Sequence, residues 1–269
     1  MNILVRVKQV PDATEIKIEP VKNTLIRKGV PSIVNPFDGY ALETALRIKD
    51  KNSDVKITVL SMGPPQAEAA LKECLAVGAD QAYLMTDRMF GGSDTLATGY
   101  ILSEGIKYIE EEKGEKFDLV LAGMQAIDGD TGQVGPGIAE NLKLPVITYV
   151  FEAEEVSDKV LKVKRENENG YEVYEVHAPA LFTVMKTPYD LRFANIMTKM
   201  KANKAEIPHI TMEELGHIDT TKIGLKGSPT KVKKTFTPDL SKKGVIIKDE
   251  DAETAVEKLL EELTSEGLL

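Results

Sequence analysis

Short apolar runs alternate with segments of helical spacing over residues 1–150, and no other feature of the sequence constrains the fold as strongly. The apolar runs predict strands at residues 2–10, 55–61, 81–86 and 117–122. Helical spacing predicts helices at residues 36–51, 65–77 and 94–112, the first with Asn35 as its N-cap. Strands that alternate with helices form a parallel sheet covered on both faces. The sequence therefore predicts a doubly wound, mostly parallel α/β sheet.

The remaining segments are predicted to be additions to this sheet. Residues 14–30 alternate like a β-hairpin, and residues 159–184 predict a second antiparallel piece with a turn at 168–170 and a last strand at 180–184. After Thr187 the chain is basic and weakly periodic, so it needs another surface to lie on, and a short final helix is expected at residues 251–263. The length of 269 residues fits either one large domain with an appendage or two small domains.

Charge and composition exclude several classes of function. A net charge of -9 argues against sequence-independent binding of nucleic acid, which needs a basic face. The single cysteine, Cys74, cannot form an internal disulfide and is expected in the core, and the three histidines lie too far apart in sequence to suggest a metal site. No leader precedes the first strand and no apolar run reaches the length of a membrane span, so we expect a cytoplasmic protein.

Four segments rich in glycine and polar residues follow the predicted strands, namely "KQVPD", "SMGPPQ", "TDRMFGGSD" and "AGMQAIDGDTGQ". In an open parallel sheet, ligands bind in the crevice outside the carboxyl ends of the strands. Two of the segments, at residues 92–95 and 131–134, lead into helices whose first N–H groups have no partner within the helix, and such a terminus binds anions. These segments indicate a nucleotide-type ligand, and the alternative is that they are merely flexible connections.

Other motifs are weaker or absent. "DGDTG" resembles the start of a calcium loop, but its twelfth position is Ala139 instead of Glu. Neither Gly-x-Gly-x-x-Gly after the first strand nor a Gly-Lys-Ser/Thr phosphate loop is present. No nucleophile is paired with a base, so we expect the chain to bind a reactive cofactor without catalytic side chains of its own.

Six segments occur in the order found in beta subunits of electron-transfer flavoproteins: "VKQVPD", "NPFDGYALETALRIKD", "SMGPPQAEAALKECLAVGAD", "AGMQAIDGDTGQVGP", "VKRENENGYEVYEVHAPALFTV" and "LRFANIMTKMKANK". The chain resembles this family over residues 1–235. The resemblance implies a Rossmann-like, adenine-nucleotide-binding domain at residues 1–205 and a C-terminal arm at 206–269 that packs on an alpha subunit. The alpha subunit carries the electron-shuttling FAD, while the site of the beta subunit holds AMP in housekeeping members and a second FAD in electron-bifurcating members.

The family's nucleotide contacts can be carried over by motif. They are Arg6, Asn35, Pro36, Phe37, Asp38, Met62, Gly63, Gly123, Met124, Gln125, Ala126, Asp128, Asp130, Thr131, Gly132, Gln133 and Val134. Arg6 stands where the family often has a smaller residue, and residues 131–132 and 134 replace a common Cys-Asn pair and a Thr. These departures leave the identity of the ligand open but keep the backbone cradle.

The segment "TDRMFGGSDTLAT" resembles the bifurcating subgroup, because housekeeping members lack its Gly-Gly-Ser-Asp-Thr turn. It adds Asp94 and Thr95 as cofactor contacts and favours FAD, reduced by NADH, over AMP. The implied mechanism sends one electron to ferredoxin or flavodoxin and the other, through the alpha-subunit FAD, to an acyl-CoA dehydrogenase. The resemblance also implies that the dehydrogenase is contacted by Phe193, Ala194, Asn195, Ile196 and Met197.

Three hypotheses stay open on the sequence alone. The first is a bifurcating subunit with FAD and NADH, and the second is a housekeeping electron carrier with a structural AMP. The third is an adenine-nucleotide-binding module without redox function. The turn at residues 91–95 favours the first over the second, and the signature at residues 163–184 favours either over the third.

Overall fold

The computed structural model describes residues 1–12, 18–19, 24–25, 31–233, 244–248 and 251–269. The chain divides into two compact units, one of residues 1–17 and 25–233, the other of residues 18–24 and 234–269. The hairpin predicted at residues 14–30 lies mostly outside the described residues. Within them, β3 (Ile18–Glu19) pairs with β4 (Thr24–Leu25).

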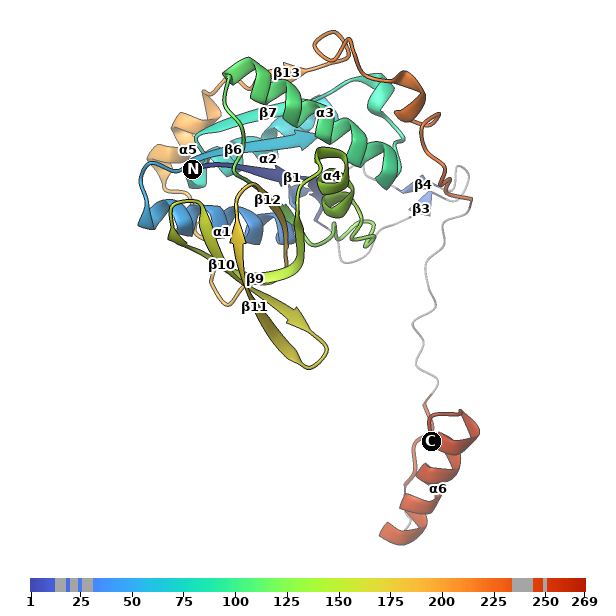
Figure 1. Ribbon diagram of the computed structural model, residues 1–269. Coiled ribbons are helices and arrows are strands. Elements are labelled where there is room, and N and C mark those ends of the chain that lie inside the picture. The colour runs from blue at the N-terminus through green and yellow to red at the C-terminus, as the bar shows by residue number, and fades with distance from the viewer. Residues whose placement is uncertain (13–17, 20–23, 26–30, 234–243, 249–250) are drawn as a thin grey trace. The chain divides into compact units, whose positions relative to one another are not determined.

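The first unit is built on one twisted sheet (Figure 1). Among the described residues it has nine strands, in the order β11 (Gly170–His177), β10 (Val160–Asn167), β9 (Val146–Ser157), β12 (Ala180–Val184), β8 (Leu119–Gly123), β1 (Asn2–Val7), β6 (Lys56–Met62), β7 (Gln81–Met85) and β13 (His209–Ile210). All pairings from β9 to β13 are parallel, and β10 pairs antiparallel with both β9 and β11. The short strands β2 (Gln9–Pro11) and β5 (Ser32–Val34) pair separately. The mostly parallel α/β sheet predicted from the sequence is thus confirmed.

Helices cover both faces of this sheet. The buried side chains of α1 (Pro36–Lys51) and α2 (Glu68–Val77) form one core cluster with one face, and those of α3 (Thr95–Lys113) and α4 (Val134–Leu142) form a second cluster with the other. Cys74 lies in the first cluster, and burial raises the pKa of its thiol. The cysteine is therefore a core residue, as its helical position predicts.

The structure differs from the sequence predictions mainly in residues 146–184. The predicted antiparallel hairpin is confirmed as β10 and β11, but it continues the central sheet through β9. The last predicted strand, β12, lies between β9 and β8, parallel to both. The strand β9 was not predicted. Smaller differences are a first turn of 3-10 helix, η1 (Pro65–Ala67), before α2, and a start of α3 at Thr95 with Asp94 as its N-cap.

The chain after Val184 continues over the surface of the first unit. It contains α5 (Ile196–Asn203), which packs on α2, and η3 (Thr220–Lys222). Another single turn, η2 (Arg88–Phe90), precedes α3. The second unit contains α6 (Ala252–Ser265), capped by Asp251, with Val256, Leu259 and Leu260 about half exposed on one face.

Candidate nucleotide site at the carboxyl edge of the sheet

Asp38, in the first turn of α1, joins the carboxyl ends of β1 and β8. Its carboxylate accepts the N–H of Lys8 at 2.7 Å and the N–H of Gly123 at 2.9 Å, and it faces the guanidinium of Arg6 at 3.5 Å. Asp38 is fully buried. Burial raises the pKa of its carboxyl group, and Arg6 and the two N–H groups oppose that rise. This carboxylate therefore holds the carboxyl ends of β1 and β8 against the start of α1.

Gly123 is required for this junction. A Cβ at this position would lie 2.4 Å from Asp38 Oδ1 and 2.7 Å from the backbone of Phe37. Only glycine lets the end of β8 approach the first turn of α1 so closely.

Asn35 occupies the N-cap position of α1 but makes no side-chain capping bond. Its Nδ2 instead donates to the carbonyl of Gln125 at 2.8 Å, and its Oδ1 accepts the N–H of Ile127 at 3.1 Å. The predicted N-cap position of Asn35 is confirmed, but its side chain does not cap the helix, because the loop after β8 uses both ends of this buried amide. The structure therefore shows Asn35 positioning the loop at residues 123–134.

That loop carries two carboxylates, and both have partners. The carboxylate of Asp128 accepts a hydrogen bond from Lys8 Nζ at 2.6 Å, and that of Asp130 accepts one from Gln125 Nε2 at 2.9 Å. Asp130 and Gly132 have φ angles of 48° and 64°, so the backbone turns sharply before α4. Lys8 was not among the residues predicted for the site, although it directly follows the first strand.

The N-termini of α3 and α4 lie side by side. Thr95 Oγ1 donates to Gln133 Oε1 at 2.7 Å and joins the two termini directly. One turn further on, a Cβ on Gly99 would lie only 3.3 Å from the backbone of Gly137, which shows how closely the helices cross. The first turn of α4 has no side-chain cap. At this point of the edge α4 thus offers N–H groups that no side chain caps, and α3, whose first turn is capped by Asp94, adds the hydroxyl of Thr95.

The other predicted contacts lie around this point. Met62 ends β6, and the N–H of Gly63 donates to the carbonyl of Met85 at 3.0 Å. Pro36 and Phe37 form the half-buried start of α1, and Met124 donates its N–H to Val184 at 2.8 Å. The residues carried over by motif therefore gather at one edge of the sheet, although Asn35, Asp38 and Asp94 use their side chains to hold protein groups.

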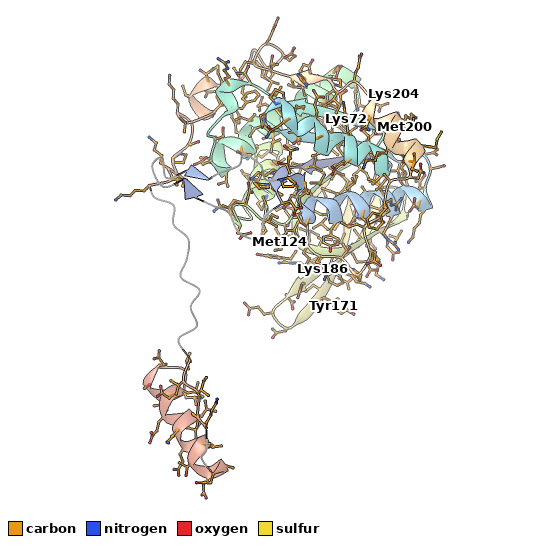
Figure 2. All side chains as sticks on the ribbon, turned by 180° about the vertical axis from the view of Figure 1, so that it is seen from behind. Lys72, Met124, Tyr171, Lys186, Met200 and Lys204 are labelled. Carbon is orange, nitrogen blue, oxygen red and sulfur yellow. The ribbon has the colours of Figure 1, made fainter. Side chains whose placement is uncertain are left out.

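The predicted partner segment lies elsewhere on the same unit. Phe193, Ile196 and Met197 are 96%, 80% and 76% exposed, and Asn195 caps α5 by accepting the N–H of Thr198. Arg192 anchors the segment to α1 through Glu43 at 2.8 Å and Asp50 at 2.7 Å. Figure 2 shows Met200 on α5 well apart from Met124 on the nucleotide loop.

No group of three or more His, Cys, Asp or Glu residues in the described part of the chain could hold a metal ion. Over the same residues, no helix is both long and apolar enough to cross a membrane.

Comparison with known proteins gives a consistent result. Residues 22–215 match the electron transfer flavoprotein domain family. The electron transfer flavoprotein subunit beta of Megasphaera elsdenii is 52% identical over 272 residues, which cover 100% of both chains. The corresponding subunit of Clostridium acetobutylicum is 50% identical over 97% of this chain and 99% of its own, and the caffeyl-CoA reductase-Etf complex subunit CarD of Acetobacterium woodii is 50% identical over 92% of both.

Proposed function

Because this chain belongs to the electron transfer flavoprotein family, as a beta subunit that partners an alpha subunit, we propose that it binds FAD at the carboxyl edge of its sheet and works as an electron-bifurcating subunit. The loop at residues 123–134 and the starts of α3 and α4 would hold this FAD. When bound, it would supply the chemistry of taking a hydride from NADH and passing the two electrons on one at a time, to ferredoxin or flavodoxin and, through the alpha-subunit FAD, to an acyl-CoA dehydrogenase in the cytoplasm.

The paired helix N-termini carry this proposal. AMP has one phosphate, which the loop at residues 123–134 and the start of α4 can hold alone. The bond between Thr95 and Gln133 adds a second helix terminus at the same place. FAD has a diphosphate, so the uncapped N–H groups of α4 together with the neighbouring hydroxyl of Thr95 match it better than they match AMP.

The donor groups at the edge also fit a nucleotide. The carboxylates of Asp128 and Asp130, which would repel a phosphate, are bound to Lys8 and Gln125. The uncapped first turn of α4 leaves its N–H groups available. In the proposed complex the chain binds and orients the cofactor, and the cofactor supplies the redox chemistry.

Phe193 to Met197 are proposed to contact the dehydrogenase. Their exposure on a segment anchored by Arg192 supports this role, since exposed aromatic and aliphatic side chains on a fixed base are typical of binding hot spots. The amphipathic helix α6 is proposed to pack on the alpha subunit, because Val256, Leu259 and Leu260 on its apolar face are about half exposed among the described residues.

The first experiment measures the cofactor content of the chain expressed with its alpha subunit. Flavin absorbance per heterodimer is combined with chromatography of acid-released nucleotides. Two FAD per heterodimer and no AMP support the proposal, and NADH titration then tests the donor. One FAD with one AMP would make the chain a housekeeping carrier, and a nucleotide without any electron transfer would make it a binding module.

A second experiment tests the paired termini. Thr95→Val removes the hydroxyl that binds Gln133 while keeping the shape of the side chain. We expect lower FAD occupancy at an unchanged melting temperature. Asp94→Ala is a poor probe, because the Asp94 carboxylate caps α3 and also accepts the N–H of Thr230. Thr221→Val, in the exposed turn η3, is the matched control.

A further inference from the structure

Residues 209–230, here named the strap, run along α3 after β13. The strap is held at several points: His217 Nε2 lies 3.1 Å from Glu104 Oε2, and the N–H of Asp219 donates to Tyr100 Oη at 3.1 Å. Near its beginning, the N–H of Met212 donates to Asp87 Oδ2 at 3.2 Å. The strap therefore belongs with the sheet domain in space, although it follows β12 and α5 in the sequence.

At its end the strap meets the turn that starts α3. The N–H of Asp94 donates to Ser228 Oγ at 2.8 Å, and the N–H of Gly224 donates to Ser93 Oγ at 3.0 Å. Each segment thus offers one serine hydroxyl to one backbone N–H of the other. We name this reciprocal pair of bonds the clasp.

The clasp is closely packed. Ser228 is 4% exposed, and its hydroxyl also donates to the carbonyl of Gly224 at 2.6 Å. Leu225 lies over Gly92, where a Cβ would come within 2.7 Å of its side chain. A buried hydroxyl that both accepts and donates fixes its neighbours more firmly than an exposed one, because no water replaces a lost bond.

The clasp also determines what α3 can offer a ligand. One oxygen of the Asp94 carboxylate accepts the N–H of Ala97 at 3.0 Å, and the other accepts the N–H of Thr230 at 2.9 Å. The carboxylate is therefore turned toward α3 and the strap. Thr95, next in sequence, keeps the hydroxyl that reaches Gln133 on α4.

We propose that Ser228 and Ser93 are positioning residues of the nucleotide site, and that through them the strap holds the N-terminus of α3 in place for the second phosphate of a diphosphate ligand. This inference rests on the proposed function, because it assumes a nucleotide at this edge. It assigns to residues 224–230, which no sequence motif pointed to, a part in the ligand preference of the site.

The test titrates the full-length chain with AMP and with ADP by calorimetry. ADP represents the adenosine diphosphate half of FAD, and AMP lacks the second phosphate. We expect ADP to bind the unchanged chain more tightly than AMP. Ser228→Ala should weaken ADP binding about tenfold and leave AMP binding unchanged, since one buried hydrogen bond that orients α3 is lost. Ser93→Ala breaks the other half of the clasp and should act in the same direction.

Thr211→Ala is the matched control. Its hydroxyl accepts the N–H of Glu213 and donates to Glu214, so it also makes two bonds, but both lie within the first part of the strap. It should change neither affinity. Melting temperatures of all variants identify any general loss of stability.

The outcomes separate the two proposals. If the unchanged chain binds neither nucleotide, the proposed function itself fails. If it binds both equally, or if the serine variants weaken AMP and ADP to the same extent, the nucleotide site stands but the positioning role of the strap is overturned. A selective loss of ADP binding in both serine variants supports it.

Discussion

The nucleotide edge and the partner segment contrast in how they use polar and apolar side chains. At the nucleotide edge the polar groups are buried and bind one another, as Asp38 and Asn35 show. At the partner segment the apolar groups are exposed, with Phe193 almost entirely in solvent. A crevice for a small ligand must be rigid before the ligand arrives, whereas a surface for a protein partner needs a fixed base and free side chains. The predictions below test each side of this contrast.

The largest effect is expected at Asp38. Asp38→Ala leaves the buried Arg6 without its counter-charge and the N–H groups of Lys8 and Gly123 without an acceptor. We expect a loss of about 3–5 kcal/mol in the free energy of unfolding, measured in urea. Asp54→Ala, at an exposed aspartate, should change it by less than about 0.5 kcal/mol. A similar small change in both variants would show that the edge is not held by its buried polar groups.

At Phe193 we expect the reverse of Asp38: stability should stay the same, and binding to the partner should weaken. Phe193→Ala should leave the unfolding free energy within about 0.5 kcal/mol of the unchanged chain, because the side chain contacts almost nothing. It should weaken binding to the dehydrogenase by about 2–4 kcal/mol, as hot-spot aromatic residues do. Surface plasmon resonance measures the binding, with Val232→Ala as an exposed apolar control. Unchanged affinity would remove Phe193 from the proposed contact.

Alanine substitutions at the two glycines where α3 and α4 cross should have smaller effects on stability, and the two effects should differ. A Cβ on Gly99 would lie 3.3 Å from the backbone of Gly137, whereas a Cβ on Gly137 has only Gly99 Cα within reach, at 3.9 Å. Gly99→Ala should therefore cost about 1–3 kcal/mol of stability. Gly137→Ala should be neutral or stabilising by up to about 1 kcal/mol, since alanine favours a helix. Equal losses would mean that the helices cross differently in solution.

The smallest effect is expected in the pH dependence of stability that comes from Asp50, which binds Arg192 at the base of the partner segment. The hydrogen bond from Arg192 lowers the pKa of Asp50 below its ordinary 3.8. A lowered pKa in the folded state stabilises the fold above pH 3.8, and this contribution is lost as the pH falls through the folded-state value. Because Asp50 is largely exposed, the contribution is below about 1 kcal/mol. Comparing the unchanged chain with Asp50→Asn above and below pH 3.8 checks it: the difference should disappear in acid.

The sequence predicted the parts of the fold that depend on local patterns. The strands β1, β6, β7 and β8 and the helices α1 and α3 follow from apolar spacing along the chain. The position of β12 between β8 and β9 was not predicted, because the pairing of strands distant in sequence leaves no local signal.

For the candidate site, the sequence predicted where the motif residues meet but not which groups their side chains hold, and their roles in binding stay predictions. The motif residues do gather at one edge, because the ends of parallel strands meet there. The motif could not reveal that Asn35 holds the loop through Gln125 and Ile127, or that Ser228 holds the turn before α3. Such contacts join segments that are far apart in the chain, and they depend on how the backbone folds between them.

The insertion of β12 also sets an order for folding during synthesis. When a ribosome has released residues 1–150, β8 is an open edge, because the strand that covers it has not yet been made. The sheet becomes continuous only after Val184 has emerged and β12 has entered between β8 and β9. Until then the nascent chain presents an unpaired strand edge of the kind that joins other chains. The strand order alone therefore leaves the edge of β8 unpaired for as long as it takes to synthesise residues 151–184.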